Sequence, residues 1–330
     1  MSAATTEPEP KASPPAPLHE LYAQMALIRA FETRVAELYR DGEIPGFVHT
    51  SLGQEGVAAG VGAALSEEDY LATTHRGHGH VLAKGADVDG MMAELFARGS
   101  GLCHGKGGSM HVSDPGRGIL GANAIVGASL PLAVGAALSS KLRRQGRVAV
   151  AFFGEGAVNQ GSFHEAVNLA AIWDLPVLLV CENNVYAEFT DSRRMTRVLS
   201  VAERAKSYGI EAMVVDGNDV EAVFAATSDS ADRCRDGRGP VLIEAETYRW
   251  HGHYEGDAQP YKPAEESESW KKRDPLIRAG GILVERGECT NEDLQQLQTQ
   301  ARTTIDKSVE RARTAEGPDA QEAYANVFVN

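Results

Sequence analysis

Several features that would place this chain in a membrane or outside the cell are missing from its sequence. No run of apolar residues approaches the ~18 that a membrane-spanning helix needs. The N-terminal segment, MSAATTEPEPKASPPAP, lacks the apolar stretch of a secretory signal. Four scattered cysteines form no C-x-x-C pair; they are Cys103, Cys181, Cys234 and Cys289. We therefore expect reduced thiols in a cytoplasmic chain that does not bind membranes.

Positive charge is also scarce. The chain has 32 lysines and arginines against 46 aspartates and glutamates, which gives a net charge of −14. This balance disfavours binding to nucleic acid and to anionic lipid surfaces. A chain of 330 residues can still bury a substantial core, as one large domain or as two small ones.

The central part of the chain reads as one β-α-β unit. The apolar run Val148–Phe153 has the length and β-branching of a buried strand. A helix is predicted next, opened by a capping box between Ser162 and Glu165. A second buried strand covers Val177–Cys181. The connection through a helix makes the two strands parallel, so their carboxyl ends lie at the same edge of a sheet.

Polar side chains follow both strands at that edge. Gly154 and Gly156 allow a sharp turn and a close approach to the backbone, and Glu155 lies between them. Asn184 follows the second strand. A carboxylate and an amide oxygen that converge there suit a hard divalent cation, and helix N-termini at the same edge suit its phosphate counter-ligand.

Other nucleotide-binding loops fit the sequence less well. A dinucleotide-binding loop, typical of nicotinamide-dependent oxidoreductases, needs a third glycine where Asn159 stands. A P-loop is excluded because Lys106, although it follows Gly105, has Ser100 at the first glycine position and Gly107 after it. A β-α-β unit without any ligand is the remaining structural alternative.

A group of histidines suggests zinc as a further alternative. The possible ligands are His75, His78, His80, Cys103, His104 and His111. Their spacing matches neither the paired ligands of structural zinc sites nor an H-E-x-x-H motif. Phosphate binding is the other interpretation, because Arg76 offers planar, permanently charged donors that suit a diphosphate oxygen.

Several motifs in the same order resemble one protein family. The stretch from Gly154-x-Gly156 to Asn183-Asn184 looks like the thiamine diphosphate motif. Residues 73–80 (TTHRGHGH), 105–111 (GKGGSMH) and 251–257 (HGHYEGD) extend the likeness over residues 18–330. The chain resembles the E1 α subunits of 2-oxo acid dehydrogenase complexes, most closely those that act on acetoin.

The resemblance implies a fold and a division of the chain. The fold is α/β, with a doubly wound, mostly parallel sheet, helices on both faces and a helical C-terminal tail. Residues 1–17, rich in Pro, Ala, Ser and Thr, are expected to be disordered. Residues 18–275 would form the thiamine diphosphate-binding domain, and residues 276–330 a helical extension for subunit packing.

The resemblance also implies roles for individual residues. Mg²⁺ would be held by the Glu155 carboxylate, the Asn184 side-chain oxygen and the backbone carbonyl of Tyr186. His49 and His253 would carry protons near the reacting end of the cofactor. The expected cofactor-binding set is His75, Arg76, Ala124, Val126, Glu155, Gly156, Ala157, Asn184, Tyr186 and His253.

The implied enzyme is incomplete as a single chain. Thiamine diphosphate catalysis needs a glutamate that hydrogen-bonds the aminopyrimidine ring, and in the resembled family a β subunit supplies it. We therefore expect an α₂β₂ heterotetramer, in which Glu55 does not take that role. The substrate would be acetoin or a 2-oxo acid such as pyruvate, and the two-carbon unit would pass to a lipoyl-bearing E2 or another carrier protein.

Three positions depart from the pattern of the resembled family. Ala124 and Ala187 stand where glycine is usual, and Glu155 stands where aspartate is usual. The extra methylene lengthens the Glu155 side chain by about 1.5 Å, whereas Mg²⁺ tolerates little deviation from bonds of ~2.0–2.1 Å. Two alternatives stay open: a biosynthetic relative that transfers a two-carbon unit to an acyl carrier protein, and a non-catalytic partner subunit.

Overall fold

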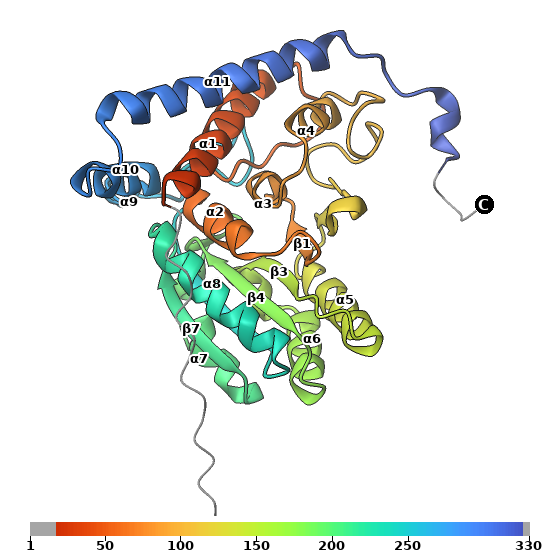
Figure 1. Ribbon diagram of the computed structural model, residues 1–330, viewed down its shortest axis with the longest axis vertical. Helices are drawn as coiled ribbons and strands as arrows, with labels where there is room; N and C mark the ends of the chain where they lie inside the picture. The colour runs from red at the N-terminus through yellow and green to blue at the C-terminus, as the bar shows by residue number, and fades with distance from the viewer. Residues whose placement is uncertain (1–17, 326–330) are drawn as a thin grey trace, which may run out of the picture.

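The structure is a computed structural model that describes residues 18–325, so the predicted disordered tail at residues 1–17 lies outside the described residues. Its centre is a six-stranded sheet in the order β2-β1-β3-β4-β8-β7, seen near the middle of Figure 1. Every neighbouring pair is parallel, so the predicted α/β sheet is confirmed. The strands are β1 (Tyr70–Thr74), β2 (Ile119–Asn123), β3 (Ala149–Gly154), β4 (Val177–Asn183), β7 (Glu211–Asp216) and β8 (Val241–Glu246).

Helices cover both faces of the sheet. One buried apolar cluster includes side chains of α1 (Leu18–Arg40), α2 (Glu55–Ala64) and α8 (Val220–Arg235). The other includes side chains of α5 (Ser129–Arg143), α6 (Gly161–Ile172) and α7 (Val201–Ala205). Side chains of β3 alternate between the two clusters, with Phe152 in the first and Phe153 in the second, as the two-residue period of a strand requires. A strand buried on both faces therefore reads as a continuous apolar run.

The predicted β-α-β unit is confirmed, but its predicted capping box is wrong. β3 and β4 pair in parallel, with Gly154 opposite Glu182. A 3₁₀ turn (Glu155–Asn159) follows β3, and α6 then begins at Gly161 with Gln160 at the cap position and no side-chain cap. Ser162 already lies inside the first turn, so it does not occupy the position from which a side chain caps a helix.

The order of the strands creates a crevice at the carboxyl edge of the sheet. From β1 the chain passes to β2 on one side, and then to β3 on the other side of β1. Ligands of open α/β sheets bind where the strand order reverses in this way. Two shorter elements follow strand ends at this edge: α3 (His78–Ala83) comes after β1, and the hairpin of β5 (Tyr186–Ala187) with β6 (Thr190–Asp191) comes after β4. A further helix, α4 (Val88–Leu95), follows α3.

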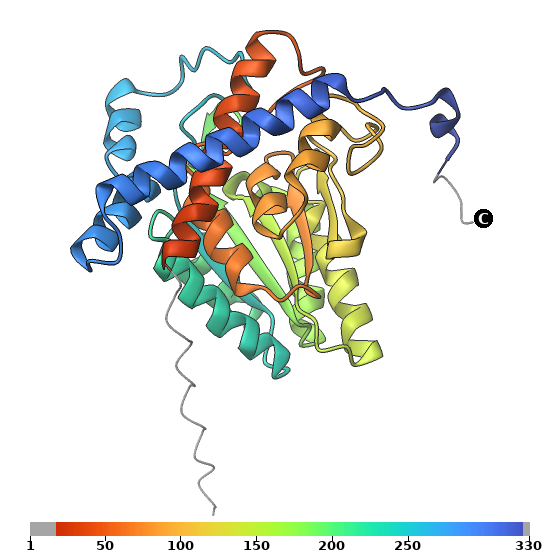
Figure 2. The ribbon, with the colours of Figure 1, turned by 45° about the horizontal axis from the view of Figure 1, so that its top comes forward.

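The C-terminal part of the described chain is helical and packs on the chain's own core. It contains α9 (Ala264–Lys271), α10 (Pro275–Glu285) and α11 (Asn291–Thr314). Figures 1 and 2 show α11 lying across α1, and Ile305 and Val309 belong to the same buried cluster as the side chains of α1. A role of this extension in subunit packing stays a prediction. Within residues 18–325, no helix has the length and apolar content that crossing a membrane requires.

Candidate active site

A cavity of about 350 Å³ opens at the carboxyl edge of the sheet. Its walls come from segments at or just after the ends of six elements, α1, β1, β2, β3, β4 and β8, and from the loop between α4 and β2, which carries Met110. A larger groove of about 1270 Å³ lies between α1, α10 and α11 and contains none of the predicted site residues. Every site residue predicted from the sequence lines the smaller cavity: His49, His75, Arg76, Ala124, Val126, Glu155, Gly156, Ala157, Asn184, Tyr186 and His253.

Glu155 and Asn184 meet in this cavity, as the parallel pairing of β3 and β4 predicts. Asn184 donates its backbone N–H to Glu155 Oε2 at 3.2 Å, and its Nδ2 donates to Gln54 Oε1 at 3.0 Å. The other two oxygens, Glu155 Oε1 and Asn184 Oδ1, are buried and have no hydrogen-bond partner. Burial raises the pKa of Glu155 to about 7. Unpaired buried oxygens are costly, and a hard divalent cation would satisfy both.

Gly156 lies directly against the hairpin that follows β4. A Cβ atom at position 156 would lie 2.5 Å from the Cβ of Ala187, much closer than two carbon atoms approach each other. The methyl group of Ala187 therefore occupies the space that glycine leaves at position 156. This contact shows how the chain accommodates alanine at a position where the resembled family usually has glycine.

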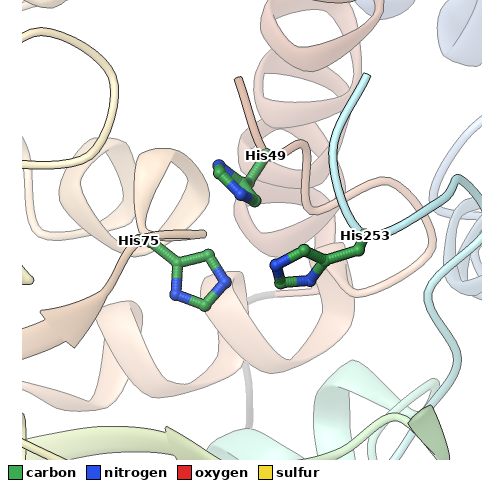
Figure 3. A group of neighbouring side chains, drawn as sticks. All are labelled: His49, His75 and His253. Carbon is green, nitrogen blue, oxygen red and sulfur yellow. The ribbon is translucent and has the colours of Figure 1, made fainter. Parts of the chain in front are cut away.

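Three histidines from distant parts of the chain turn their rings toward one another (Figure 3). The ring centroids of His49 and His75 are 4.7 Å apart, those of His49 and His253 5.0 Å, and those of His75 and His253 5.4 Å. Burial, followed by the charge of Arg76, lowers the pKa of His49 to about 2, of His75 to about 3 and of His253 to about 4. The three imidazoles are therefore uncharged at neutral pH.

Arg76 connects the loops that carry two of these histidines. Its Nη1 donates to the carbonyl of Thr50 at 2.6 Å, and its Nη2 donates to the carbonyl of His253 at 2.7 Å. Burial and the nearby Arg249 lower the pKa of Arg76 to about 9, which still leaves the guanidinium charged at neutral pH. A buried positive charge beside uncharged imidazoles favours an anionic group in the cavity.

Sequence reasoning missed three charged residues of the cavity wall, Arg249, Glu182 and Glu188. Arg249 is buried and donates to the carbonyls of Tyr186, at 3.4 Å, and Glu188, at 2.8 Å. The signal that could have identified it is its position: an arginine just after an apolar strand, beside the His251-Gly252-His253 motif. Two buried cationic side chains, rather than one, thus face the cavity.

The zinc site considered for His75, His78 and His80 is not formed. Both ring nitrogens of His80 already have partners, Thr73 Oγ1 at 2.7 Å and Glu182 Oε1 at 3.1 Å. His78 has separate partners in the core. Within residues 18–325, the group of possible ligands close enough to share an ion is His49, His75 and His253. The two guanidinium groups beside that cluster oppose a divalent cation there.

The match to known proteins covers nearly the whole chain. Residues 23–321 match the sequence profile of the family described as Dehydrogenase E1 component. The chain belongs to this family. The assignment confirms the predicted resemblance.

Three relatives of this E1 component are similar along most of their length. The chain is 45% identical over 311 residues to the α subunit of acetoin:2,6-dichlorophenolindophenol oxidoreductase of Bacillus subtilis (strain 168). The aligned residues make up 94% of this chain and 93% of the relative. The protein of the same name from Cupriavidus necator is 42% identical over 311 residues, with the same coverage of 94% and 93%. The pyruvate dehydrogenase E1 component subunit alpha of Rhizobium meliloti is 39% identical over 309 residues, 93% of this chain and 89% of the relative.

Membership of the E1 family shows the class of the enzyme. The family depends on thiamine diphosphate, and its members are oxidoreductase components. The relatives are named as α subunits, which implies a β subunit as partner. Glu55 is buried, pairs with Arg29 at 2.5 Å, accepts from Gly53 N–H at 3.1 Å and does not line the cavity. Its position therefore agrees with the expectation that it is not the activating glutamate.

Proposed function

We propose that this chain is the α subunit of a thiamine diphosphate-dependent E1 enzyme that cleaves acetoin, or a 2-oxo acid such as pyruvate, next to a carbonyl group. The two-carbon unit then passes to a lipoyl-bearing E2 protein in the cytoplasm. One observation carries the proposal: Glu155 Oε1 and Asn184 Oδ1 are buried without donors in a cavity that Arg76 also lines.

The residues present fit Mg²⁺ and the diphosphate group. Glu155 and Asn184 each offer an unpaired oxygen, and the backbone carbonyl of Tyr186 accepts a long hydrogen bond of 3.4 Å from Arg249. These three oxygens would hold Mg²⁺, which prefers oxygen ligands and shares them with phosphates. Arg76 and the neighbouring histidines would hold the diphosphate, whose negative charge would compensate the two buried guanidinium groups.

The small residues of the cavity fit a flat ring. Ala124 and Val126 line one part of the wall, and Gly156 and Ala157 line another. When bound, thiamine diphosphate supplies a nucleophilic carbon and an electron sink for cleavage next to a carbonyl. The role of this chain is to orient that group and to exchange protons. Nδ1 of His49 and Nδ1 of His253 are buried without partners. Burial and the charge of Arg76 keep both rings uncharged in the cofactor-free chain. A bound diphosphate would compensate that charge, so that each ring could take up and return a proton.

Exposed apolar side chains beside the cavity support a partner chain there. Ile125 and Val126 line the cavity and are 71% and 51% exposed, and the exposed Phe189 ring packs 5.9 Å from His253. Apolar groups that stay exposed together at a site typically mark an interface. We infer that the β subunit covers them, supplies the activating glutamate and forms an α₂β₂ assembly in which residues 276–330 assist packing.

The test combines binding with turnover. The chain is co-purified with its β subunit and titrated calorimetrically with thiamine diphosphate, with and without Mg²⁺. We expect Mg²⁺-dependent binding, followed by reduction of 2,6-dichlorophenolindophenol with acetoin, pyruvate or both. Absence of binding would leave the alternative of a non-catalytic subunit, and binding without turnover of either substrate would favour a biosynthetic relative.

A further inference from the structure

A carboxylate in the middle of α1 has no part in the proposed chemistry. Glu32 is fully buried, and its neighbours on the inward face of the helix, Ile28, Phe31 and Val35, belong to the apolar core. Burying a charge among apolar groups is unfavourable unless hydrogen bonds compensate it. Both carboxylate oxygens of Glu32 accordingly have hydrogen-bond partners.

Each oxygen of Glu32 is bonded to a different segment of the chain: Oε1 to a loop, and Oε2 to the first residue of α3. Oε1 accepts from the backbone N–H of Ser51 at 3.0 Å and from its hydroxyl at 2.7 Å. Oε2 lies 2.9 Å from His78 Nδ1, and His78 Nε2 lies 2.9 Å from the hydroxyl of Ser109. An ionised carboxylate only accepts, so Nδ1 carries the proton; in the uncharged ring Nε2 then accepts from Ser109.

The order serine, histidine, acid is that of a hydrolytic triad, but the surroundings exclude this function. Ser109 is only 5% exposed, and the cavity is lined by its neighbour Met110 and not by Ser109 itself. A nucleophile must reach a substrate. The chain of hydrogen bonds therefore serves to hold parts of the molecule in place.

The three segments joined by Glu32 directly adjoin residues that line the cavity. Ser51 follows His49 by two residues, His78 follows Arg76 by two residues, and Ser109 directly precedes Met110. The junction is tightly packed as well. A Cβ at Gly79 would meet both Ile28 of α1 and the Ser51 hydroxyl at 3.1 Å.

The glycine-rich loop has a second, independent anchor. Glu94 of α4 is fully buried and accepts four backbone N–H groups, from Cys103, Gly105, Gly107 and Gly108, at 2.7 to 3.0 Å. The loop therefore wraps around a carboxylate of its own chain. Because Glu94 fixes residues 103–108, the bond from Ser109 to His78 controls only the last part of the loop, where Met110 enters the cavity.

We propose that Glu32 is a positioning residue: through Ser51 and His78 it sets the spacing of the two histidine-bearing loops, and through Ser109 it sets the place of Met110. The consequence for cofactor binding rests on the proposed function. The effect of Glu32 on the spacing of the loops is independent of the proposed function, because it concerns contacts within the folded chain.

The test compares Glu32→Gln with Glu32→Ala in the full-length chain. Glutamine keeps the shape and can rebuild the network if His78 adopts its other tautomer and donates to Ser109, whereas alanine removes every bond. Hydrogen exchange followed by mass spectrometry reports on the loops, and calorimetry with thiamine diphosphate and Mg²⁺ reports on the cavity. Asp69→Asn is the matched control, because Asp69 is also fully buried but bonds at the opposite end of β1.

We expect Glu32→Ala to accelerate exchange in residues 49–54 and 109–111, and to weaken cofactor binding, each about tenfold or more. Glu32→Gln should stay within about threefold of wild type on both measures. Asp69→Asn should lower the melting temperature without either effect. Equal changes in Glu32→Ala and Asp69→Asn at these loops would overturn the proposal.

Two further outcomes separate the test of Glu32 from the test of the proposed function. If the wild type does not bind thiamine diphosphate, the proposed function fails, and the exchange comparison alone decides the role of Glu32. If Glu32→Ala does not fold, Ser109→Ala takes its place, since it removes a single hydroxyl. Exchange should then increase in residues 109–111 and stay unchanged in residues 49–54; no increase in residues 109–111 would overturn the proposal.

Discussion

Asn184 donates its backbone N–H to Glu155 Oε2 across two neighbouring strand ends, at 3.2 Å. The two oxygens of this carboxylate therefore have different surroundings. Oε2 holds the turn after β4, and Oε1 stays unpaired beside Asn184 Oδ1. The longer side chain of glutamate, compared with the aspartate usual in the resembled family, thus spans from the turn after β3 to the backbone of the next loop.

Replacement of the charged oxygen should remove the metal site. Glu155→Gln keeps the length of the side chain but removes its charge, so the dissociation constant for Mg²⁺ in the presence of thiamine diphosphate should rise at least about 10- to 100-fold. Calorimetric titration measures it. Glu188→Gln is the control, because Glu188 lines the same cavity but is exposed. Equal weakening in both variants would mean that general charge in the cavity, and not ligation by Glu155, attracts the metal.

Shortening the same side chain should separate metal binding from stability. In Glu155→Asp the carboxylate draws back toward β3, so Mg²⁺ binding should tighten if the longer side chain strains the ligand geometry. The buried N–H of Asn184 would lose its acceptor, which should lower the stability of the metal-free chain by about 1 kcal/mol. Chemical denaturation and Mg²⁺ titration measure the two effects. Weaker Mg²⁺ binding in Glu155→Asp would refute the idea of a strained ligand.

The contact between Gly156 and Ala187 predicts a compensating pair of substitutions. Gly156→Ala would force two methyl groups together, since the new Cβ would lie 2.5 Å from the Cβ of Ala187. We expect a loss of about 1–3 kcal/mol in the free energy of unfolding, typical of overpacking. Ala187→Gly should restore most of it in the double variant, and urea denaturation of all four proteins measures the coupling. Additive effects would show that the two positions are independent.

The convergence of the site residues could be predicted from the sequence because it follows from local patterns. Val148–Phe153 and Val177–Cys181 have the length and composition of buried strands, and the helix between them makes the pair parallel. From that pairing alone, Glu155 and Asn184 arrive at one edge. The roles of the histidines, in contrast, came from the family resemblance, because a loop histidine carries no local signal of its neighbours.

The parts that could not be predicted depend on contacts between distant segments. Arg76 binds the carbonyl of His253, and Glu32 binds Ser51, across separations that no periodicity encodes. The capping box failed for a different reason. Ser162 fits the local pattern, but the 3₁₀ turn after β3 leads α6 to begin before it.

The buried histidines should make the metal-free chain sensitive to acid. The pKa of His49 is lowered from 6.5 to about 2 in the folded chain, so below about pH 6.5 the unfolded chain takes up a proton that the folded chain cannot. The lowered pKa of His49 therefore has no cost above that pH and reduces the free energy of unfolding as the pH falls below it. The raised pKa of Glu155 has the opposite sign, because it favours the folded chain at pH values below about 7.

A single substitution measures the contribution of His49 to this loss of stability in acid. Between about pH 7 and pH 5, the melting temperature of His49→Gln should fall less than that of the wild type, by about 2 °C or more. Differential scanning fluorimetry without metal or cofactor measures both profiles. His111→Gln, at an exposed histidine, is the control and should follow the wild type. Parallel profiles for His49→Gln and the wild type would contradict the assignment of a buried, uncharged His49.

The two bonds of Arg76 give the sharpest distinction between charge and geometry. Arg76→Lys keeps the positive charge, but one ammonium group cannot reproduce the planar fork that reaches the carbonyls of both Thr50 and His253. We expect thiamine diphosphate binding to weaken about tenfold, with faster hydrogen exchange in the loop that contains His253. Arg98→Lys is the matched control, because Arg98 also donates to a distant carbonyl, that of Ala312, outside the cavity. If Arg76→Lys binds the cofactor as tightly as the wild type, positive charge alone suffices at this position, and the link between the two histidine loops does not determine affinity.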